Sequence, residues 1–295
     1  MLELRDMQLL LSLARHKHFA RAAGVCGISQ PAFSMRIRNL EAQLGLSIVK
    51  RGNRFQGFTE EGDIVLRWAR KITDDARAME QEILSAKGTI SGTLTVGVIP
   101  TALAYASRLP AMLAQVHPGI MVRLRSATSL QIQQGIEDGS IDAGITYEDG
   151  VSADVLDLLP LYQETYVLVS PRELAPRLTG TATWAEAAAL PLSLLIRDMQ
   201  NRRILDRHFA EMNLHPRVLS ENNAFTSSLV MVNEGFTATI VPQALVAALG
   251  ELENAIALPL VEPELSKSIC LVSAVRNPGL ATVQALQRVL TPDPS

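Results

Sequence analysis

The chain has 295 residues, of which 47% are hydrophobic and 19% are charged, and its net charge at neutral pH is −3. This length predicts about two domains with ample core material, and no apolar run reaches the roughly 18 residues that a membrane span needs. The N-terminus carries acids and lacks an apolar segment with a cleavage site. We therefore expect no signal peptide, no membrane partner and a cytoplasmic location.

The charges are distributed unevenly along the chain. Residues 1–59 hold nine Lys and Arg against three acidic residues, a net charge of +6, whereas the remainder carries −9. A small basic head on a larger acidic body is expected when only the head contacts phosphate groups. The two cysteines, Cys26 and Cys270, lack metal or redox spacing and are predicted to be small, partly buried hydrophobic residues.

Residues 4–14 and 18–24 predict two short helices, and 24–28 a turn before a third helix within 28–45. This third helix begins at Ser29 and Pro31 and ends at Gly45, which are typical start and stop residues. One stripe is apolar and predicted to face a core: Phe33, Ile37, Leu40 and Leu44. The other side carries short, polar or cationic residues without an acid, which suits a DNA major groove: Pro31, Ser34, Met35, Arg38 and Asn39. Considered alone, this helix could equally be an ordinary surface helix.

The next segment, residues 46–58, combines glycines, alternating hydrophobic residues and the cations Lys50, Arg51 and Arg54. Together with the preceding helices it predicts a winged helix-turn-helix, with the wing beside the DNA backbone.

A long helix is predicted from Thr59 to Lys87. Its apolar positions follow a spacing of three and four residues: Val65, Trp68, Ile72, Ala76, Met79, Ile83 and Ala86. At 1.5 Å per residue this helix is roughly 40 Å long, too long to bury its stripe against a small head. We expect a second copy of the chain to cover it; the alternative is packing within the same chain.

After a linker at 88–92, strands and helices alternate. Strands at 93–99, 121–126 and 142–146, with helices at 102–116 and 130–138, predict two βαβ units and a parallel sheet. Further strands are predicted at 162–170, 192–196, 217–220, 238–241, 256–260 and 269–274, with helices near 200–212, 224–234, 242–249 and 280–290. If the last segment returns to the first half, two α/β lobes with a cleft between them result.

Ligands of open α/β sheets bind beyond the carboxyl ends of the strands. Hydroxyls and free backbone N–H groups at such ends suit a carboxylate or another small anion. The candidate contacts are Pro100, Thr101, Thr128, Ser129 and Tyr147 in the first half, with Arg202 and Thr226 from the other lobe. Each hydroxyl could instead be a helix cap.

Signals for other chemistry are poor. The chain lacks a glycine-rich phosphate fingerprint, a G-x-S-x-G motif and an H-E-x-x-H motif. Its five histidines show no metal pattern beyond the neighbouring His16 and His18. We therefore expect no cofactor, no metal and no enzymatic activity.

Several motifs in the basic head occur in a fixed order: HFARAA at 18–23, SQPAFS at 29–34, IRNLE at 37–41, Leu44-Gly45, Arg51 and FTEEG at 58–62. Together they resemble the LysR-type transcriptional regulators. The chain departs from the family pattern at Met35, where arginine is common, at Val49, where phenylalanine is usual, and at His18, where a small hydroxyl residue is common.

The resemblance implies an α/β protein with three parts. These are a winged helix-turn-helix DNA-binding domain (1–58), a linker helix for dimerisation with a hinge (59–91), and a bilobed effector domain resembling periplasmic binding proteins (92–295). Its lobe I would comprise about 92–161 and 268–295, and lobe II about 162–267. The expected dimerisation residues are Val65, Trp68, Ile72, Met79 and Ile83.

The implied function is sequence-specific regulation of transcription, with operator binding modulated by a small effector in the cleft. The expected operator contacts are Ser29, Gln30, Pro31, Ser34, Arg36 and Arg38, with Arg51 and Arg54 on phosphates. The expected partners are double-stranded DNA, the effector, a homodimer or homotetramer, and RNA polymerase at the promoter. The alternative is a cytoplasmic solute-binding or sensor protein without promoter control; an enzyme ranks third.

Overall fold

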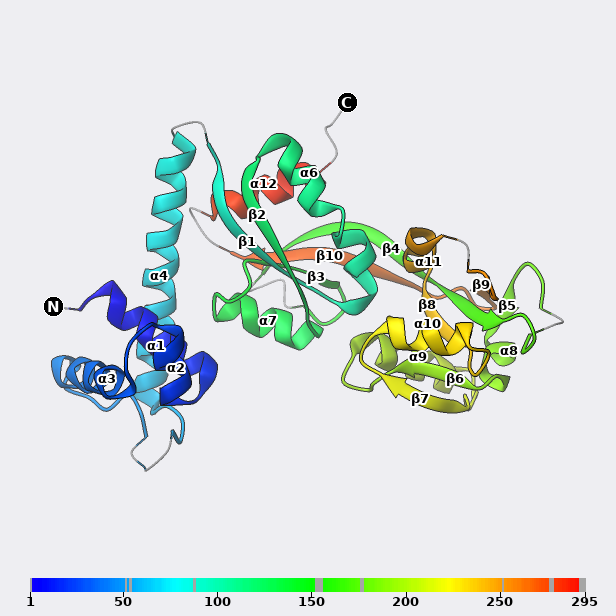
Figure 1. Ribbon diagram of the computed structural model, residues 1–295, viewed down its shortest axis with the longest axis horizontal. Coiled ribbons are helices and arrows are strands. Elements are labelled where there is room, and N and C mark those ends of the chain that lie inside the picture. Colours follow the sequence, from blue (N-terminus) through cyan, green and yellow to red (C-terminus); the bar gives the residue numbers. More distant parts are fainter. Residues whose placement is uncertain are drawn as a thin grey trace. The chain divides into compact units, whose positions relative to one another are not determined.

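The structure is a computed structural model that describes residues 2–50, 52, 55–86, 89–151, 156–175, 178–250, 252–275 and 279–291. The chain forms two compact units, Met1–Gly88 and Thr89–Ser295. Figure 1 shows the helices and strands of each unit.

The first unit is helical. It contains α1 (Leu4–His16), α2 (Phe19–Val25), α3 (Gln30–Leu44) and α4 (Glu60–Ala86). The predicted apolar stripe of α3 is confirmed, because Phe33, Ile37 and Leu40 are buried against α1 and α2. Further side chains of this core are Leu9, Leu10, Leu13, Ala22, Ile48 and Leu66. The helix-turn-helix therefore rests on one shared hydrophobic core.

The segment after α3 is held to the head by a carboxylate. Glu41 Oε1 accepts hydrogen bonds from the N–H groups of Ile48 (2.7 Å) and Val49 (3.0 Å). The predicted wing is represented by one antiparallel bridge between Val49 and Phe58 and by a bond from Lys50 N–H to Gly57 O. Arg51 and Arg54 lie outside the described residues.

The start of α4 is anchored to this segment. Thr59 Oγ1 accepts from Gly62 N–H at 2.9 Å and donates to Ser47 O at 2.6 Å. Acidic residues in the first turn, Glu60, Glu61 and Asp63, favour the positive end of the helix dipole. The helix runs for 27 residues, which confirms the predicted long helix.

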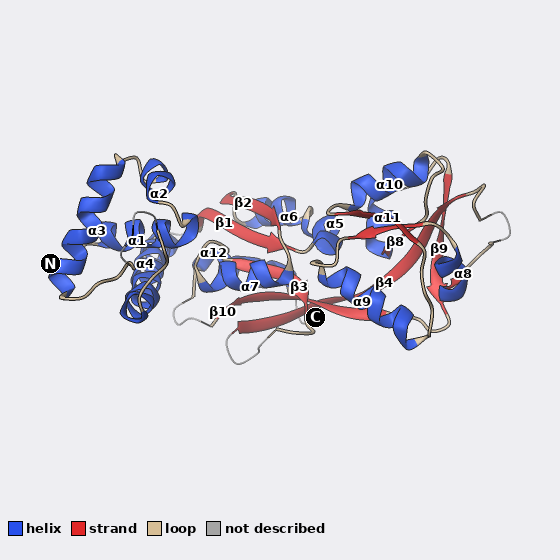
Figure 2. Ribbon diagram, turned by 90° about the horizontal axis from the view of Figure 1, so that it is seen from below, coloured by secondary structure: helices blue, strands red, loops and turns tan. Residues whose placement is uncertain are grey.

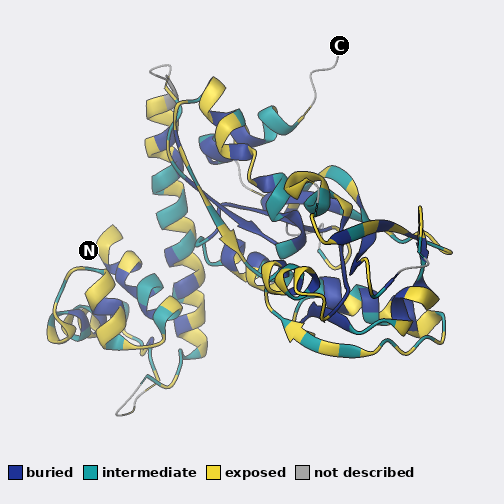
Figure 3. Ribbon diagram, turned by 45° about the vertical axis from the view of Figure 1, so that its right-hand side comes forward, coloured by how far each residue is buried: buried dark blue, intermediate teal, exposed yellow. Residues whose placement is uncertain are grey.

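The second unit begins with a parallel sheet. Strand β1 (Ser91–Val98) pairs in parallel with β2 (Gly119–Ser126) and β3 (Ala143–Tyr147), as predicted. The strand β10 (Ser266–Ala274) returns from the end of the chain and pairs antiparallel with β3. Figure 3 shows the central strands of this sheet as buried. Helices α6 (Leu109–Val116) and α12 (Ala281–Leu290) contact each other, and α7 (Ser129–Glu137) contacts β1, β3 and β10.

One strand joins the two lobes of this unit. Strand β4 (Leu156–Pro171) spans 16 residues. Its first part pairs with β10, and its last six residues pair with β8 (Thr239–Pro242) and β9 (Ala255–Val261). Figure 2 shows β4 continuing from the sheet of the first lobe into the second. The bilobed prediction depended on the terminal segment returning to the first half of this unit. Strand β10 makes this return, because it pairs with both β3 and β4.

The second lobe surrounds a core that includes Trp184, Leu194, Leu205 and Phe209. Its elements are β5 (Ala182–Thr183), α8 (Trp184–Ala189), β6 (Leu192–Leu195), α9 (Gln200–Glu211), β7 (Val218–Asn222), α10 (Phe225–Asn233) and α11 (Gln243–Leu249). The sequence did not predict β5 and α8. The single helix predicted at 102–116 is also wrong. This stretch of chain instead forms a 3-10 turn at Pro100–Ala102, α5 (Leu103–Ala106) and α6, because Pro110 cannot continue the earlier helix.

Candidate functional site

Most of the residues of α3 that were expected to contact an operator lie at its solvent-facing side. Ser29 caps the helix by accepting from Ala32 N–H at 3.4 Å, and Gln30 Nε2 donates to Ser34 Oγ at 3.2 Å. Pro31 and Arg38 are exposed beside them, as are Asn39 and Met35, which is 60% exposed. This face presents hydroxyl, amide and guanidinium groups without an acidic side chain, which is the chemistry that reads base edges and phosphates.

Arg36 is placed differently from the expectation that it contacts an operator. Its Nε lies 2.8 Å from Asp6 Oδ1 and its Nη2 lies 2.6 Å from Glu3 Oε2. The hydrogen bonds that Arg36 donates to these carboxylates raise its pKa. The guanidinium therefore ties α3 to the start of α1, because Asp6 is buried and its charge needs a partner.

The predicted dimerisation stripe lies exposed along α4. Trp68 is 59% exposed, Met79 57% and Ile83 51%, and Ile72 is also exposed. Val65 differs from these, because it packs against the core of the head. Ile64, which the sequence reading omitted, is exposed instead. Four of the five predicted residues thus remain uncovered within the chain.

Five of the predicted effector contacts gather around one small cavity in the second unit. The first lobe contributes Pro100, Thr101, Thr128, Ser129 and Tyr147, and the second contributes Leu195, Met199, Gln200 and Asn201. The strand ends bring the first set together, since β1, β2 and β3 are parallel and end at the same edge. The cavity thus lies where the two lobes meet. None of these nine residues carries a charge, and neither does Ile99, the tenth residue of the lining.

A buried polar cluster adjoins this cavity, and two of its members, Tyr147 and Asn201, also line the cavity. The hydroxyls of Tyr147 and Tyr166 donate to Glu164 Oε1 at 2.7 and 2.8 Å, and Asn201 Nδ2 donates to Tyr147 Oη at 3.4 Å. Burial raises the pKa of Glu164 to about 7, although the tyrosine hydrogen bonds lower it. Glu164 Oε2 and Asn201 Oδ1 have no hydrogen-bond partner within the described residues.

The sequence reading missed Glu164 and Asn201. Glu164 lies within the predicted strand at 162–170, where an acid ordinarily faces solvent, and only the pairing of β4 with its neighbours turns it inward. The available signal was weak: a lone acid two residues from both Tyr162 and Tyr166, with the polar residues Gln163 and Thr165 on either side.

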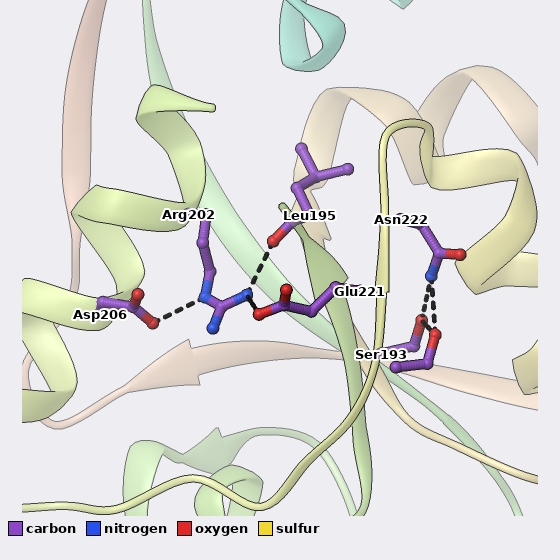
Figure 4. A network of polar contacts seen from close by, with 7 residues as sticks. Ser193, Leu195, Arg202, Asp206, Glu221 and Asn222 are labelled. Carbon is purple, nitrogen blue, oxygen red and sulfur yellow. Dashed lines mark hydrogen bonds and ion pairs between the residues drawn. The ribbon is translucent and has the colours of Figure 1, made fainter. Parts of the chain in front are cut away.

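Arg202 and Thr226 are not among the residues that line this cavity. Arg202 is only 2% exposed. Its Nε lies 2.7 Å from Asp206 Oδ1, and its Nη1 lies 2.8 Å from Glu221 Oε1 and 2.9 Å from Leu195 O. Figure 4 shows this network joining α9 to β6 and β7. The expectation for Arg202 is corrected because its charge is already neutralised inside the lobe. Thr226 is exposed in the first turn of α10.

Residues 4–63 match the bacterial regulatory helix-turn-helix protein, lysR family, and residues 87–293 match the LysR substrate binding domain. The chain belongs to the LysR family of transcriptional regulators. It is therefore a DNA-binding regulator with an effector-binding domain, and the family is one of regulators rather than enzymes.

Full-length relatives agree with this assignment. The chain is 27% identical over 290 residues to the hydrogen peroxide-inducible genes activator of Haemophilus influenzae, covering 94% of this chain and 92% of the relative. It is equally identical to the DNA-binding transcriptional dual regulator OxyR of Escherichia coli K12, covering 94% and 91%. The RuBisCO operon transcriptional regulator of Allochromatium vinosum is 36% identical over 139 residues, 47% of this chain and 46% of the relative.

Solved structures of LysR-type regulators share the fold. A full-length OxyR variant from Pseudomonas aeruginosa has a TM-score of 0.77 and 20% identity, covering 98% of this chain and 95% of that one. Full-length CbnR complexed with its target DNA has a TM-score of 0.67 and 20% identity, covering 98% and 99%. In this LysR-type chain, no described helix is long and apolar enough to cross a membrane.

Proposed function

We propose that α3 is the recognition helix and that Ser29, Gln30, Pro31, Ser34 and Arg38 contact the operator. The observation that carries this assignment is the acid-free exposed face of α3, backed by the buried stripe of Phe33, Ile37 and Leu40. In this proposal Arg51 and Arg54 bind phosphates. Arg36 supports α3 through its two ion pairs.

Met35 has a specific consequence for this surface. It is 60% exposed on α3 and can offer a base edge only apolar contact. The polar part of the readout therefore depends on Gln30, Ser34 and Arg38. We therefore expect this chain to bind an operator sequence different from those bound by regulators that carry arginine at this position.

A second copy of the chain covers the exposed stripe of α4 in this proposal. Trp68, Ile72, Met79 and Ile83 present apolar surface at coiled-coil spacing. Pairing along α4 places two recognition helices on one operator, whose half-sites would be about one helical turn apart or a multiple of that. A homotetramer would combine two such pairs.

The effector of this proposal binds between the lobes, where Thr101, Thr128 and Ser129 supply hydroxyls and the start of α7 supplies backbone N–H groups. The cavity as it stands has a volume of about 10 Å³, so in this proposal the lobes separate to admit a small carboxylate, which these neutral donors then hold. Binding shifts the lobes between two settings and thereby changes the spacing of the paired heads. The regulator then alters how RNA polymerase uses the promoter, acting in the cytoplasm.

Several relatives are named for induction by hydrogen peroxide. The cysteines of this chain do not favour activation by peroxide. Oxidation by peroxide needs an accessible thiolate. Cys270 is buried in β10, and burial raises the pKa of its thiol to about 12. Cys26 is half-buried in the head, far from the effector-binding unit in sequence.

The test of the recognition helix is a quantitative operator-binding measurement after the bound genomic sites have been mapped. Gln30→Ala and Ser34→Ala should relax specificity, since they remove base contacts, whereas Arg38→Gln should weaken binding. A Gln30→Ala, Arg38→Ala double variant that shifts its operator as well as the parent chain would contradict the assignment. The effector mechanism is tested by footprints with and without small monocarboxylates; identical footprints throughout would contradict it.

The competing solute-binding or sensor role predicts ligand binding without operator binding. The helix-turn-helix unit, with its own core and cationic face, favours the regulator.

A further inference from the structure

Glu164 lies where strand β4 passes from the first lobe of the second unit into the second lobe. The strand pairs with β10 up to Thr165, and from Tyr166 onward it pairs with β8 and β9. The Glu164 residue is only 2% exposed. A carboxyl group is therefore buried at the junction of the two lobes.

Both lobes reach this carboxyl group through hydrogen bonds. Tyr147, from β3 of the first lobe, donates to Glu164 Oε1 at 2.7 Å, and Tyr166 donates to the same oxygen at 2.8 Å. Asn201, on α9 of the second lobe, donates from Nδ2 to Tyr147 Oη at 3.4 Å. The second lobe is thus linked through Tyr147 to the carboxyl group on the strand that joins the lobes.

Two acceptor atoms of this cluster lack a donor. Glu164 Oε2 and Asn201 Oδ1 are buried and have no hydrogen-bond partner among the described residues. Both belong to groups that bond to the same atom, Tyr147 Oη. A buried acceptor without a donor is unfavourable, above all when it carries charge. One further donor hydrogen between the two atoms would satisfy both.

The charged groups around Glu164 are engaged elsewhere. Lys267, its opposite residue on β10, forms an ion pair with another carboxylate. Tyr162, on the same strand, stacks on Tyr105 with the ring centroids 4.8 Å apart, and Arg108 lies over the Tyr105 ring. Burial raises the pKa of Tyr162 to about 13, so its hydroxyl stays protonated.

Glu164 is the group of this cluster that changes its charge near neutral pH. Burial raises its pKa to about 7, although hydrogen bonds from Tyr147, Tyr166 and Thr101 lower it. Burial also holds the pKa of both tyrosines well above the ordinary value, so they remain donors. The charge of this cluster therefore depends on one proton.

We propose that Glu164 is a proton-dependent switch between the two lobes. When protonated, it donates from Oε2 to Asn201 Oδ1 and holds the lobes in the closed setting, which is the setting of this structure. When the proton leaves to solvent, the carboxylate has an unpaired oxygen, which water reaches once the lobes separate. Protons thereby become an input to the regulator. The switch uses no bound ligand, so it does not depend on the effector assignment.

The direction of the response to pH follows from the two settings. With the lobes separated, the carboxyl group is hydrated and ionises near its usual pKa of 4.5, against about 7 when it is buried. The closed setting is therefore favoured at low pH and loses stability across this window. The ratio of separated to closed lobes should rise by at most about tenfold per pH unit and level off above about pH 7.

A distance measurement between spin labels tests the switch in the full-length chain. The labels are attached through Leu130→Cys on α7 and Arg207→Cys on α9, two exposed residues that line the same groove from opposite lobes. Cys26→Ser prevents labelling of the head, whereas Cys270 is fully buried and is kept. Excess unlabelled chain keeps labelled copies apart.

The measurement is made from about pH 4.5 to about pH 8, a range that brackets the window. A longer label distance should gain population as the pH rises. Infrared spectra recorded in parallel should show the carbonyl band of a protonated carboxyl group fading over the same range.

Three variants assign the response. Glu164→Gln imitates the protonated form, because its amide donates where the proton did, so the lobes should stay closed at every pH and the infrared band should be lost. Asn201→Leu removes the acceptor and should lower the pH at which the ratio levels off by about half to one unit. Tyr162→Phe is the matched control, since its hydroxyl has no partner among the described residues, and it should behave as the parent does.

Label distances that do not change with pH in the parent chain would overturn the proposal. A pH response that persists in Glu164→Gln would do the same, and His208→Gln would then show whether that titratable residue of α9 is responsible. A response that Tyr162→Phe abolishes and Asn201→Leu leaves intact would also refute the switch, because it would assign the missing contact to the wrong partner.

Discussion

Arg36 Nε on α3 lies 2.8 Å from Asp6 Oδ1 on α1, so α3 is fastened to the first helix of the head. Asp6 is 7% exposed and needs this partner, since a buried unpaired carboxylate is strongly unfavourable. The same residue type two positions later, Arg38, is exposed. The two arginines of α3 therefore differ: Arg36 is held by two carboxylates, whereas the side chain of Arg38 is exposed.

Arg36→Gln should destabilise the head by about 1–3 kcal/mol, because it removes two charged hydrogen bonds and leaves Asp6 unpaired. It should leave the salt dependence of operator binding unchanged for the folded protein. Arg38→Gln is the matched control, with stability within about 0.5 kcal/mol of the parent and a salt slope lower by about one. Urea unfolding and binding at several salt concentrations measure both. A reduced slope for Arg36→Gln would show that this residue contacts DNA.

Gly62→Ala should destabilise the head by about 1–3 kcal/mol. A Cβ atom at this position would lie 2.2 Å from Ile48 O, so α4 would have to move away from the segment it is anchored to. The control is Gly24→Ala in α2, where a Cβ meets nothing within 4 Å and helix propensity favours alanine by about 0.5–1 kcal/mol. Thermal unfolding of both variants measures the difference in stability. Equal unfolding midpoints would contradict the close approach of Gly62 to Ile48 O.

Ile72→Lys combined with Met79→Lys should convert dimers into monomers, because two charges would be buried in the proposed α4 pairing. Sedimentation velocity measures the change. Arg67→Gln, an exposed position on another face of α4, should keep the oligomeric state of the parent. If the double lysine variant remains dimeric and folded, the stripe is not the interface.

Glu164→Gln should become progressively more stable than the parent as pH rises from about 4.5 to about 7. The unfolded carboxyl ionises near its usual pKa of 4.5, whereas burial raises the pKa in the folded state to about 7. Across this window the unfolded parent binds fewer protons than the folded one, so the parent loses stability, up to about 3 kcal/mol above pH 7. Urea unfolding at a series of pH values measures the difference; a difference independent of pH would contradict the assignment to Glu164.

The helices of the head were predictable because their signals are local. The cap at Ser29, the stripe of Phe33, Ile37 and Leu40, and the stop at Gly45 all lie within one segment. The strand ends that carry Thr101 and Thr128 were predictable for the same reason, since parallel βαβ units bring such ends together. The roles of Arg36 and Arg202 were not predictable, because Asp6 lies 30 residues from Arg36 and Glu221 lies 19 residues from Arg202. Only the pair of Arg202 with Asp206 is local in the sequence.

The sequence by itself determined the family, most of the order of elements, the acid-free exposed face of α3 and four of the five predicted residues of the exposed α4 stripe. These follow from motif order, helical periodicity and charge, all of which act over short stretches of chain. Only the tertiary structure decided that Glu164 lies buried beside Tyr147 and that Arg202 is neutralised within its lobe. These facts depend on which strands pair and which helices pack, and such long-range contacts leave no periodic trace in the sequence.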